Sequence, residues 1–180
     1  MKKYELTAEF IEKWGKKLFR IKALISFGSV EAGELGGYVE KEDNLAQDGD
    51  AWVYGDARVY GDARVCGDAR VYGDAWVYGD ARVYGDAWVY GDARVCGDAW
   101  VYGNAEVCGN ADYLLIGRIG SRFSFTTFFK NKDKGITVSC GCFLGTIAEF
   151  RAKVTDTHGN NKHAKMYNLA ADMAELQILG

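Results

Sequence analysis

The sequence contains no proline, only two histidines and no long apolar run. Without proline, its turns must be made by the 23 glycines and by Asp and Asn residues. The five cysteines are an odd number, and acidic residues interrupt the N-terminal segment before an export signal can form. We therefore expect a reduced, cytoplasmic protein. No segment approaches the ~18 apolar residues of a membrane span, so no membrane partner is predicted.

The chain also lacks a large excess of either charge, because its formal net charge is −3. The charge is unevenly distributed: residues 49–112 carry five Arg against ten Asp and one Glu, while residues 113–180 have an excess of basic residues. A mildly acidic middle segment disfavours nucleic acid as a partner, since binding to phosphates requires basic side chains.

A glycine recurs at every sixth residue from Gly49 to Gly109, and the repeated unit reads Gly-Asp-Ala-x-Val-Tyr, with Arg or Trp usually at x. Six residues are too few for a helical repeat or a propeller blade, but they fit a solenoid of short strands joined by tight corners. Because side chains alternate along a strand, Ala and Val should share the inner face, while x and Tyr point outward.

The pattern of an aliphatic residue followed four positions later by a small one, from Val53–Ala57 to Val107–Ala111, resembles the hexapeptide-repeat family. That resemblance implies a left-handed parallel β-helix with three hexapeptides per coil. Residues 35–40, Leu-Gly-Gly-Tyr-Val-Glu, are more narrowly similar to an uncharacterised bacterial and phage group labelled hexapeptide transferases. The chain departs from the family where Tyr or Cys follows the aliphatic residue, a position at which the family often has a small one.

The expected fold class is mainly β, a hexapeptide solenoid with an N-terminal β cap and a small C-terminal α+β cap. The expected domains are a β cap at 1–36, the solenoid at 37–117, and a cap or small domain at 118–180. The elements expected in the flanks are strands at 9–14, 17–27, 123–130 and 136–144, and helices from 147 to about 159 and from 162 to 177. We expect the second helix to place Met166, Ala170, Met173 and Leu176 on one side.

With three hexapeptides per coil, residues eighteen apart stack in columns, about 4.8 Å apart. The x positions form three columns, in two of which Trp and Arg alternate, and Tyr columns lie beside them. Arg over indole is a favourable contact, and Trp, Tyr and Arg dominate binding hot spots. The predicted binding residues are Trp52, Arg58, Arg70, Trp76, Trp88, Arg94, Trp100, Tyr54, Tyr72 and Tyr90. The alternative is that these columns only stabilise the solenoid.

The resemblance implies, for an acyltransferase, a histidine acting as general base, and the repeat contains none. No catalytic residue is therefore predicted, and His158 and Cys140 are the candidates left in the tail. No metal site or cofactor is predicted either. Cys140, Cys142, His158 and His163 are of the residue types that bind zinc, but their spacing is not a typical one. Calcium at the Asp corners is a further alternative.

The leading hypothesis is a non-catalytic module that presents Trp, Arg and Tyr columns to a protein partner, for instance as an inhibitor or ligand-sequestering protein of a phage or mobile element. A nucleotide or another small ligand, and a homo-oligomer, stay open as partners. The alternatives are an acyl-CoA-dependent acyltransferase acting on a small acceptor and a purely structural repeat protein.

Overall fold

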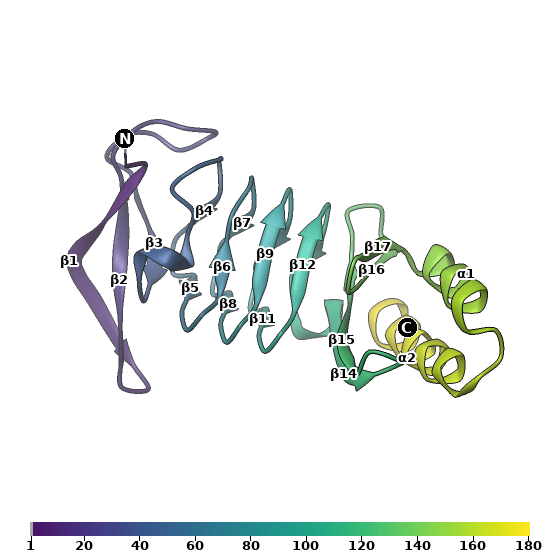
Figure 1. The fold of residues 1–180 in the computed structure, drawn as a ribbon. Coiled ribbons are helices and arrows are strands. Elements are labelled where there is room, and N and C mark those ends of the chain that lie inside the picture. Colours follow the sequence, from purple (N-terminus) through teal and green to yellow (C-terminus); the bar gives the residue numbers. More distant parts are fainter. Residues whose placement is uncertain (1) are drawn as a thin grey trace.

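The computed structural model describes residues 2–180 as a rod with three parts that follow one another along the chain. N-terminal strands form one end, a stack of coils the middle, and a sheet with two helices the other end (Figure 1). This is the predicted mainly β fold, a parallel β-solenoid with a different cap at each end.

The coils consist of short strands that pair in parallel with the strands of the next coil. The strands of the first face are β3 (Leu35–Val39), β5 (Arg58–Val59), β8 (Trp76–Val77) and β11 (Arg94–Val95). The second face has β4 (Trp52–Val53), β7 (Arg70–Val71), β10 (Trp88–Val89) and β13 (Glu106–Val107), and the third has β6 (Arg64–Val65), β9 (Arg82–Gly85) and β12 (Trp100–Gly103). The paired residues confirm three hexapeptides per coil, because Arg58 lies beside Trp76 and Trp76 beside Arg94.

The first coil is longer than the others, since Tyr38 pairs with Arg58, twenty residues further along the chain. The 3-10 turn η1 (Glu42–Asn44) lies inside it. The later pairs are all eighteen residues apart, as the columns require.

The core of the solenoid is the predicted Ala/Val stripe. Every Ala and Val of the repeats from Ala51 to Val107 is fully buried. The upstream residues Val39 and Leu45 join the same core. A column of small and β-branched side chains fills the narrow interior.

The corners depend on glycine in a left-handed backbone conformation. The ten repeat glycines from Gly49 to Gly103 have positive φ angles, whereas Gly109, the last of the run, has φ −154°. Gly67 also lies against the next coil, because a Cβ built there would be 2.9 Å from the backbone nitrogen of Gly85. Glycine is therefore required for its conformation and for the close spacing of the coils.

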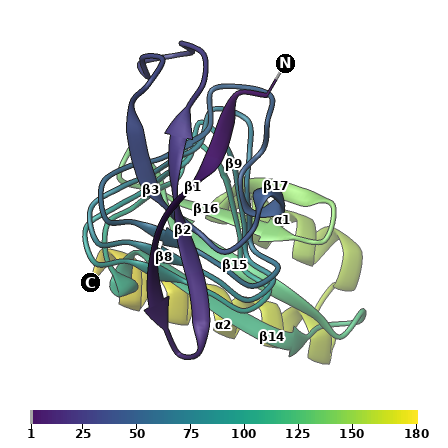
Figure 2. The ribbon, with the colours of Figure 1, turned by 90° about the vertical axis from the view of Figure 1, so that its left-hand side faces the viewer.

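The N-terminal cap is a hairpin of β1 (Tyr4–Lys13) and β2 (Lys16–Ala23), and β2 pairs antiparallel with β3. Figure 2 shows this hairpin in front of the coils. The predicted strands were displaced, since β1 begins at Tyr4 rather than residue 9 and β2 ends at Ala23 rather than residue 27. The Lys3 ammonium, which is 2% exposed, donates hydrogen bonds to the carbonyl oxygens of Asp48, Gly49 and Ala51.

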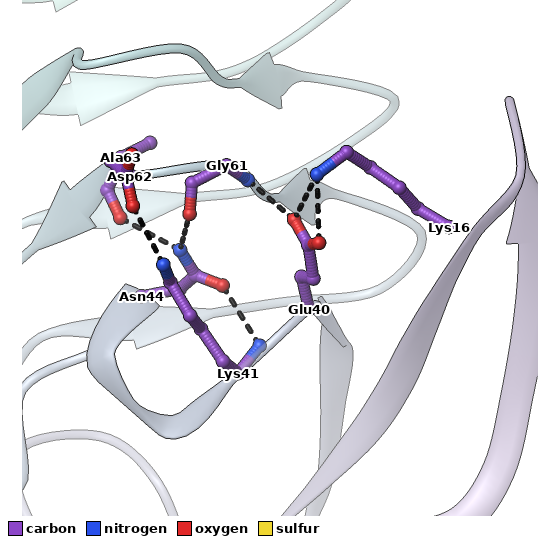
Figure 3. Close-up of polar contacts among 7 residues, drawn as sticks. All are labelled: Lys16, Glu40, Lys41, Asn44, Gly61, Asp62 and Ala63. Atoms are coloured by element: carbon purple, nitrogen blue, oxygen red, sulfur yellow. Dashed lines mark hydrogen bonds and ion pairs between the residues drawn. The ribbon is translucent and has the colours of Figure 1, made fainter.

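A network of polar side chains joins the hairpin to the first coil (Figure 3). Glu40 accepts hydrogen bonds from Lys16 Nζ at 2.7 Å and from the Gly61 backbone nitrogen at 2.7 Å. Burial raises the pKa of Glu40, but these bonds outweigh it and lower the pKa overall. The buried Asn44 side chain donates to the carbonyl oxygens of Gly61 at 3.1 Å and Ala63 at 2.8 Å.

The C-terminal cap is an antiparallel sheet covered by two helices. Its elements are β14 (Tyr113–Ile119), β15 (Ser124–Lys130), β16 (Ile136–Cys140), β17 (Phe143–Thr146), α1 (Ile147–His158) and α2 (Lys162–Leu179). Adjacent residues of β15 face opposite ways, so that Phe129 enters the solenoid core and Phe128 the helical core. The sheet thus lies between the last coil and the helices.

Two details of this cap differ from the sequence-based expectation. The strand expected at 136–144 is two strands, because Gly141, with φ +60°, turns the chain. The expected end of the solenoid at residue 117 falls inside β14, which pairs with β15 after the 3-10 turn η2 (Asn110–Asp112). Helix α1 begins as expected after residue 146, where Thr146 and Glu149 form a capping box.

The buried face of α2 is not the expected one. Its buried residues are Ala164, Tyr167, Ala170, Ala171, Ala174 and Ile178. Of the expected face only Ala170 is buried, and Leu176 is 78% exposed. Alanine lets the helix approach α1 and the sheet closely. A prediction that assigns the largest apolar side chains to the buried face misses a face made mostly of alanine. Within residues 2–180, neither helix has the length and apolar character needed to cross a membrane.

Candidate functional site

Arginine and tryptophan side chains stack on the outside of the solenoid. The guanidinium carbons of Arg58 and Arg94 lie 5.5 and 4.9 Å from the ring centroid of Trp76, one on each side. Arg70 lies 5.6 Å from Trp88, and Arg82 lies 5.0 Å from Trp100. The stacking of arginine on tryptophan and the distances between them match the expected cation–π arrangement.

Trp52 is an exception among the predicted binding residues. It pairs with Arg70 in the expected register, but its side chain is 0% exposed. Tyr4 and Phe27 of the N-terminal cap pack on it edge-on, with ring centroids 6.0 and 5.4 Å away. Trp52 is therefore a core residue at the junction with the cap, and no external partner can reach it in this structure.

The tyrosine columns stack next to the Arg and Trp columns. The rings of Tyr72 and Tyr90 are parallel, with centroids 5.0 Å apart, and Tyr54 meets Tyr72 edge-on at 6.5 Å. The Tyr90 hydroxyl donates to Glu106 Oε1 at 2.8 Å, and this bond raises the pKa of Tyr90. Burial raises the pKa of Tyr72 as well. Both tyrosines are therefore neutral hydrogen-bonding groups near neutral pH.

An open groove lies on the second face. Its volume is about 330 Å³, and it is lined by Ser29, Tyr54, Arg70, Tyr72 and Trp88. The Ser29 hydroxyl, from the loop after β2, is 3.1 Å from the hydroxyl of Tyr54. None of the described residues that line the groove is acidic. Three aromatic rings and one guanidinium in a concave surface can bind a planar or apolar group beside a hydrogen-bond acceptor or anion.

Two further residues on this face, Ser29 and Lys132, could not be predicted from the sequence. Ser29 reaches the groove only because the N-terminal cap folds back over the first coil. The Lys132 ammonium, from the loop after β15, lies 4.4 Å from the ring centroid of Trp88. Both positions lie outside the repeat, and no spacing in the sequence links them to it.

The first face is partly covered by the chain itself. Trp14, in the turn between β1 and β2, lies 4.7 Å from Trp76 and 5.9 Å from Tyr60, measured between ring centroids. Trp14 is 64% exposed and has a positive φ of 48°. An aromatic ring of the N-terminal cap therefore lies against Trp76.

The Asp corners form few ion pairs. Arg58 Nη1 lies 4.0 Å from Asp74 Oδ1, and Lys41 lies 2.7 Å from Asp62. Asp112 occupies an x position rather than a corner. It is 8% exposed in η2, where its carboxylate accepts hydrogen bonds from the backbone nitrogens of Cys108 and Gly109. Within residues 2–180, no three His, Cys, Asp or Glu side chains come together as a metal site would require.

Three of the four tail candidates line one cavity of the C-terminal cap, namely Cys140, Cys142 and His158. The fourth, His163, lies beside His158 with a centroid distance of 5.8 Å. Cys140 Sγ accepts a hydrogen bond from Thr126 Oγ1 at 3.2 Å. Among the described residues no hydrogen bond joins Cys140 to His158, so the pair lacks the contact that activates a thiol nucleophile.

Comparison with known proteins supports the solenoid. Residues 51–67, 63–79, 75–91 and 89–103 each match the family model described as the YdcK beta solenoid repeat. The matched segments run from β4 to β12 and leave both caps outside. They do not confirm the narrower similarity to hexapeptide transferases. No curated protein matches the chain.

Proposed function

We propose that this repeat β-solenoid protein is a non-catalytic binding module whose working surface is the groove of the second face. The observation that carries the proposal is the gathering of Tyr54, Tyr72, Trp88 and Arg70 around an open concavity, with Ser29 at its edge. These residue types are the ones that dominate binding hot spots.

The rigidity of the solenoid supports this function. Each groove residue belongs to a hydrogen-bonded strand or follows one directly, apart from Ser29. Neighbouring aromatic rings and guanidinium groups hold the side chains in place, for example Arg70 on Trp88 and Tyr72 on Tyr90. A surface that is ordered before binding loses little conformational entropy when a partner arrives.

The proposed partner is a protein that offers an apolar or aromatic side chain next to an acceptor for Arg70. Nucleic acid is disfavoured, because the corners next to the groove carry a regular series of carboxylates. An inhibitor or ligand-sequestering protein of a phage or mobile element would use such a surface to hold its target.

The test compares two double variants that remove equivalent contacts on different faces. Tyr72→Ala/Trp88→Ala alters the groove, and Tyr84→Ala/Trp100→Ala is its matched control. The Tyr–Trp centroid distance is 6.3 Å in the first pair and 6.4 Å in the second, and each tryptophan carries a stacked arginine. Both variants should lose similar amounts of stability, while only the first alters the proposed surface.

We expect wild type and the control to capture the same protein from a cell lysate, and the groove variant to retain less than a tenth of it. Purified prey should then bind wild type and control with the same Kd. Equal capture by all three proteins would reject the groove as the binding surface, and the absence of any specific prey would favour a purely structural role. Saturable binding of acetyl-CoA that is lost in His158→Ala would instead support the acyltransferase hypothesis.

A further inference from the structure

A cavity of about 210 Å³ lies in the C-terminal cap, far along the chain from the solenoid groove. The β16–β17 turn, the segment before β15, and helices α1 and α2 surround it. Its lining combines polar and apolar side chains from all of these elements.

The charged residues at this cavity are all basic. Arg122 and Lys153 line it, and none of the described lining residues is Asp or Glu. Within residues 2–180, neither side chain forms an ion pair. Arg151, two positions before Lys153 on α1, shows the contrast: its guanidinium is bound by Asp172 at 2.7 Å and Glu175 at 2.8 Å. The two cations at the cavity thus keep their charge available for a ligand.

The positions of these cations are set by the surrounding backbone. A Cβ built on Gly141 would be 3.7 Å from Arg122 Nη1, so the guanidinium lies over the β16–β17 turn. Lys153 projects from α1, one position before the buried Val154. The two positive groups therefore belong to different elements that line the same cavity.

Four of the other lining residues carry aromatic rings, namely Phe143, Phe150, His158 and Tyr167. Phe150 lies edge-on to Tyr167 with centroids 5.6 Å apart, and Phe143 lies 5.6 Å from Phe150. The His158 ring stacks on Tyr167 at 5.7 Å. A cavity of roughly 150 Å³ accommodates a benzene ring. The space is thus sufficient for one ring-sized apolar body together with a charged group.

We propose that this cavity binds a small organic anion, in which a carboxylate or phosphate monoester is attached to a compact aromatic or apolar body. Arg122 and Lys153 hold the anionic group, and Phe143, Phe150 and Tyr167 contact the body. The hydroxyls of Ser121, Ser124 and Thr157 supply further donors. The site is independent of the solenoid groove, and it involves no covalent step.

Binding can be tested on the full chain with phenyl phosphate and benzoate as anionic probes and benzyl alcohol as the uncharged one. We expect at least one anion to bind wild type, by titration calorimetry and by amide shifts in α1 and the β16–β17 turn. Benzyl alcohol should bind at least tenfold more weakly. Arg122→Ala/Lys153→Ala should weaken binding of the anion at least tenfold, and Lys153→Glu should abolish it.

Lys165→Ala is the matched control, because Lys165 is an exposed lysine of α2 that does not line the cavity. It should bind the anion as wild type does. Both altered positions are exposed, so the variants should keep the wild-type far-UV spectrum. Equal affinity for benzyl alcohol, unchanged binding in Arg122→Ala/Lys153→Ala, or no binding of either anion would each overturn the proposal.

Discussion

At the scale of single residues, the corner glycines have two roles that can be separated. They adopt a left-handed backbone conformation, and some of them also allow the next coil to approach closely. All corner glycines up to Gly103 need a left-handed conformation, but only some of them also touch the next coil. Gly55 has φ +56° and no atom within 4 Å of a built Cβ, whereas Gly67 has φ +71° and meets Gly85. The comparison isolates the contribution of coil-to-coil contact.

We therefore expect Gly55→Ala to lower the free energy of unfolding by about 1–2 kcal/mol, the cost of a left-handed residue with a Cβ. Gly67→Ala should cost about 3 kcal/mol or more, because the coils must also move apart. Urea unfolding followed by circular dichroism measures both. Equal losses in the two variants would show that the spacing of the coils is not limited at Gly67.

Residue-level reasoning from the sequence was most successful where the repeat decides the environment. The Ala/Val core and the stacking of Arg58, Trp76 and Arg94 follow directly from the period of six and the alternation of a strand. Trp52 was misassigned as a surface residue because its burial comes from Tyr4 and Phe27 of the cap. No local pattern at Trp52 distinguishes it from Trp88.

At the scale of elements, polar side chains in and next to the turn η1 join the first coil to the second. Asn44 is fully buried and bonds two carbonyl oxygens of the next coil, while its neighbour Lys41 forms an exposed ion pair with Asp62. The two residues lie in the same turn but in different environments, so their contributions should differ greatly.

Asn44→Ala should reduce the free energy of unfolding by roughly 2–3 kcal/mol, because the buried carbonyl oxygen of Ala63 and the part-buried one of Gly61 lose their donor. Lys41→Ala should cause no measurable change, since an exposed pair is screened by solvent. Thermal unfolding of the two variants beside wild type provides the measurement. A large effect of Lys41→Ala would mean that the ion pair, rather than the amide, holds the turn.

The two caps were harder to predict than the repeat. Their strands lack a period, so a break such as Gly141 could not be distinguished from a glycine within a strand. The α2 face was misjudged because Met166, Met173 and Leu176 are more hydrophobic than the alanines that pack. The groove likewise needs Ser29 from the cap, which only the folded chain brings next to Tyr54.

At the scale of the whole molecule, the eighteen-residue coil is a unit that can be removed while the later repeats keep their faces. Removing residues 68–85 joins Gly67 to Asp86, which restores the Gly-Asp corner and keeps every later side chain on its own face. Removing residues 68–82 deletes fifteen residues and exchanges the inward and outward positions.

The eighteen-residue deletion should fold with a wild-type β spectrum and a rod shorter by about 4.8 Å, the spacing of adjacent strands. The fifteen-residue deletion should not fold cooperatively. Small-angle scattering and thermal unfolding test both expectations. A folded product from the shorter deletion would contradict the assignment of the Ala/Val face as the core.

The two-sided packing of β15 has a consequence for how the molecule loses its structure. Phe129 completes the hydrophobic interior of the rod, and Phe128, its immediate neighbour, completes that of the helical layer. Detachment of the helices would thus disturb the strand that closes the last coil, and fraying of that coil would loosen the helices. We expect the C-terminal third to melt together with the repeats rather than as a separate unit.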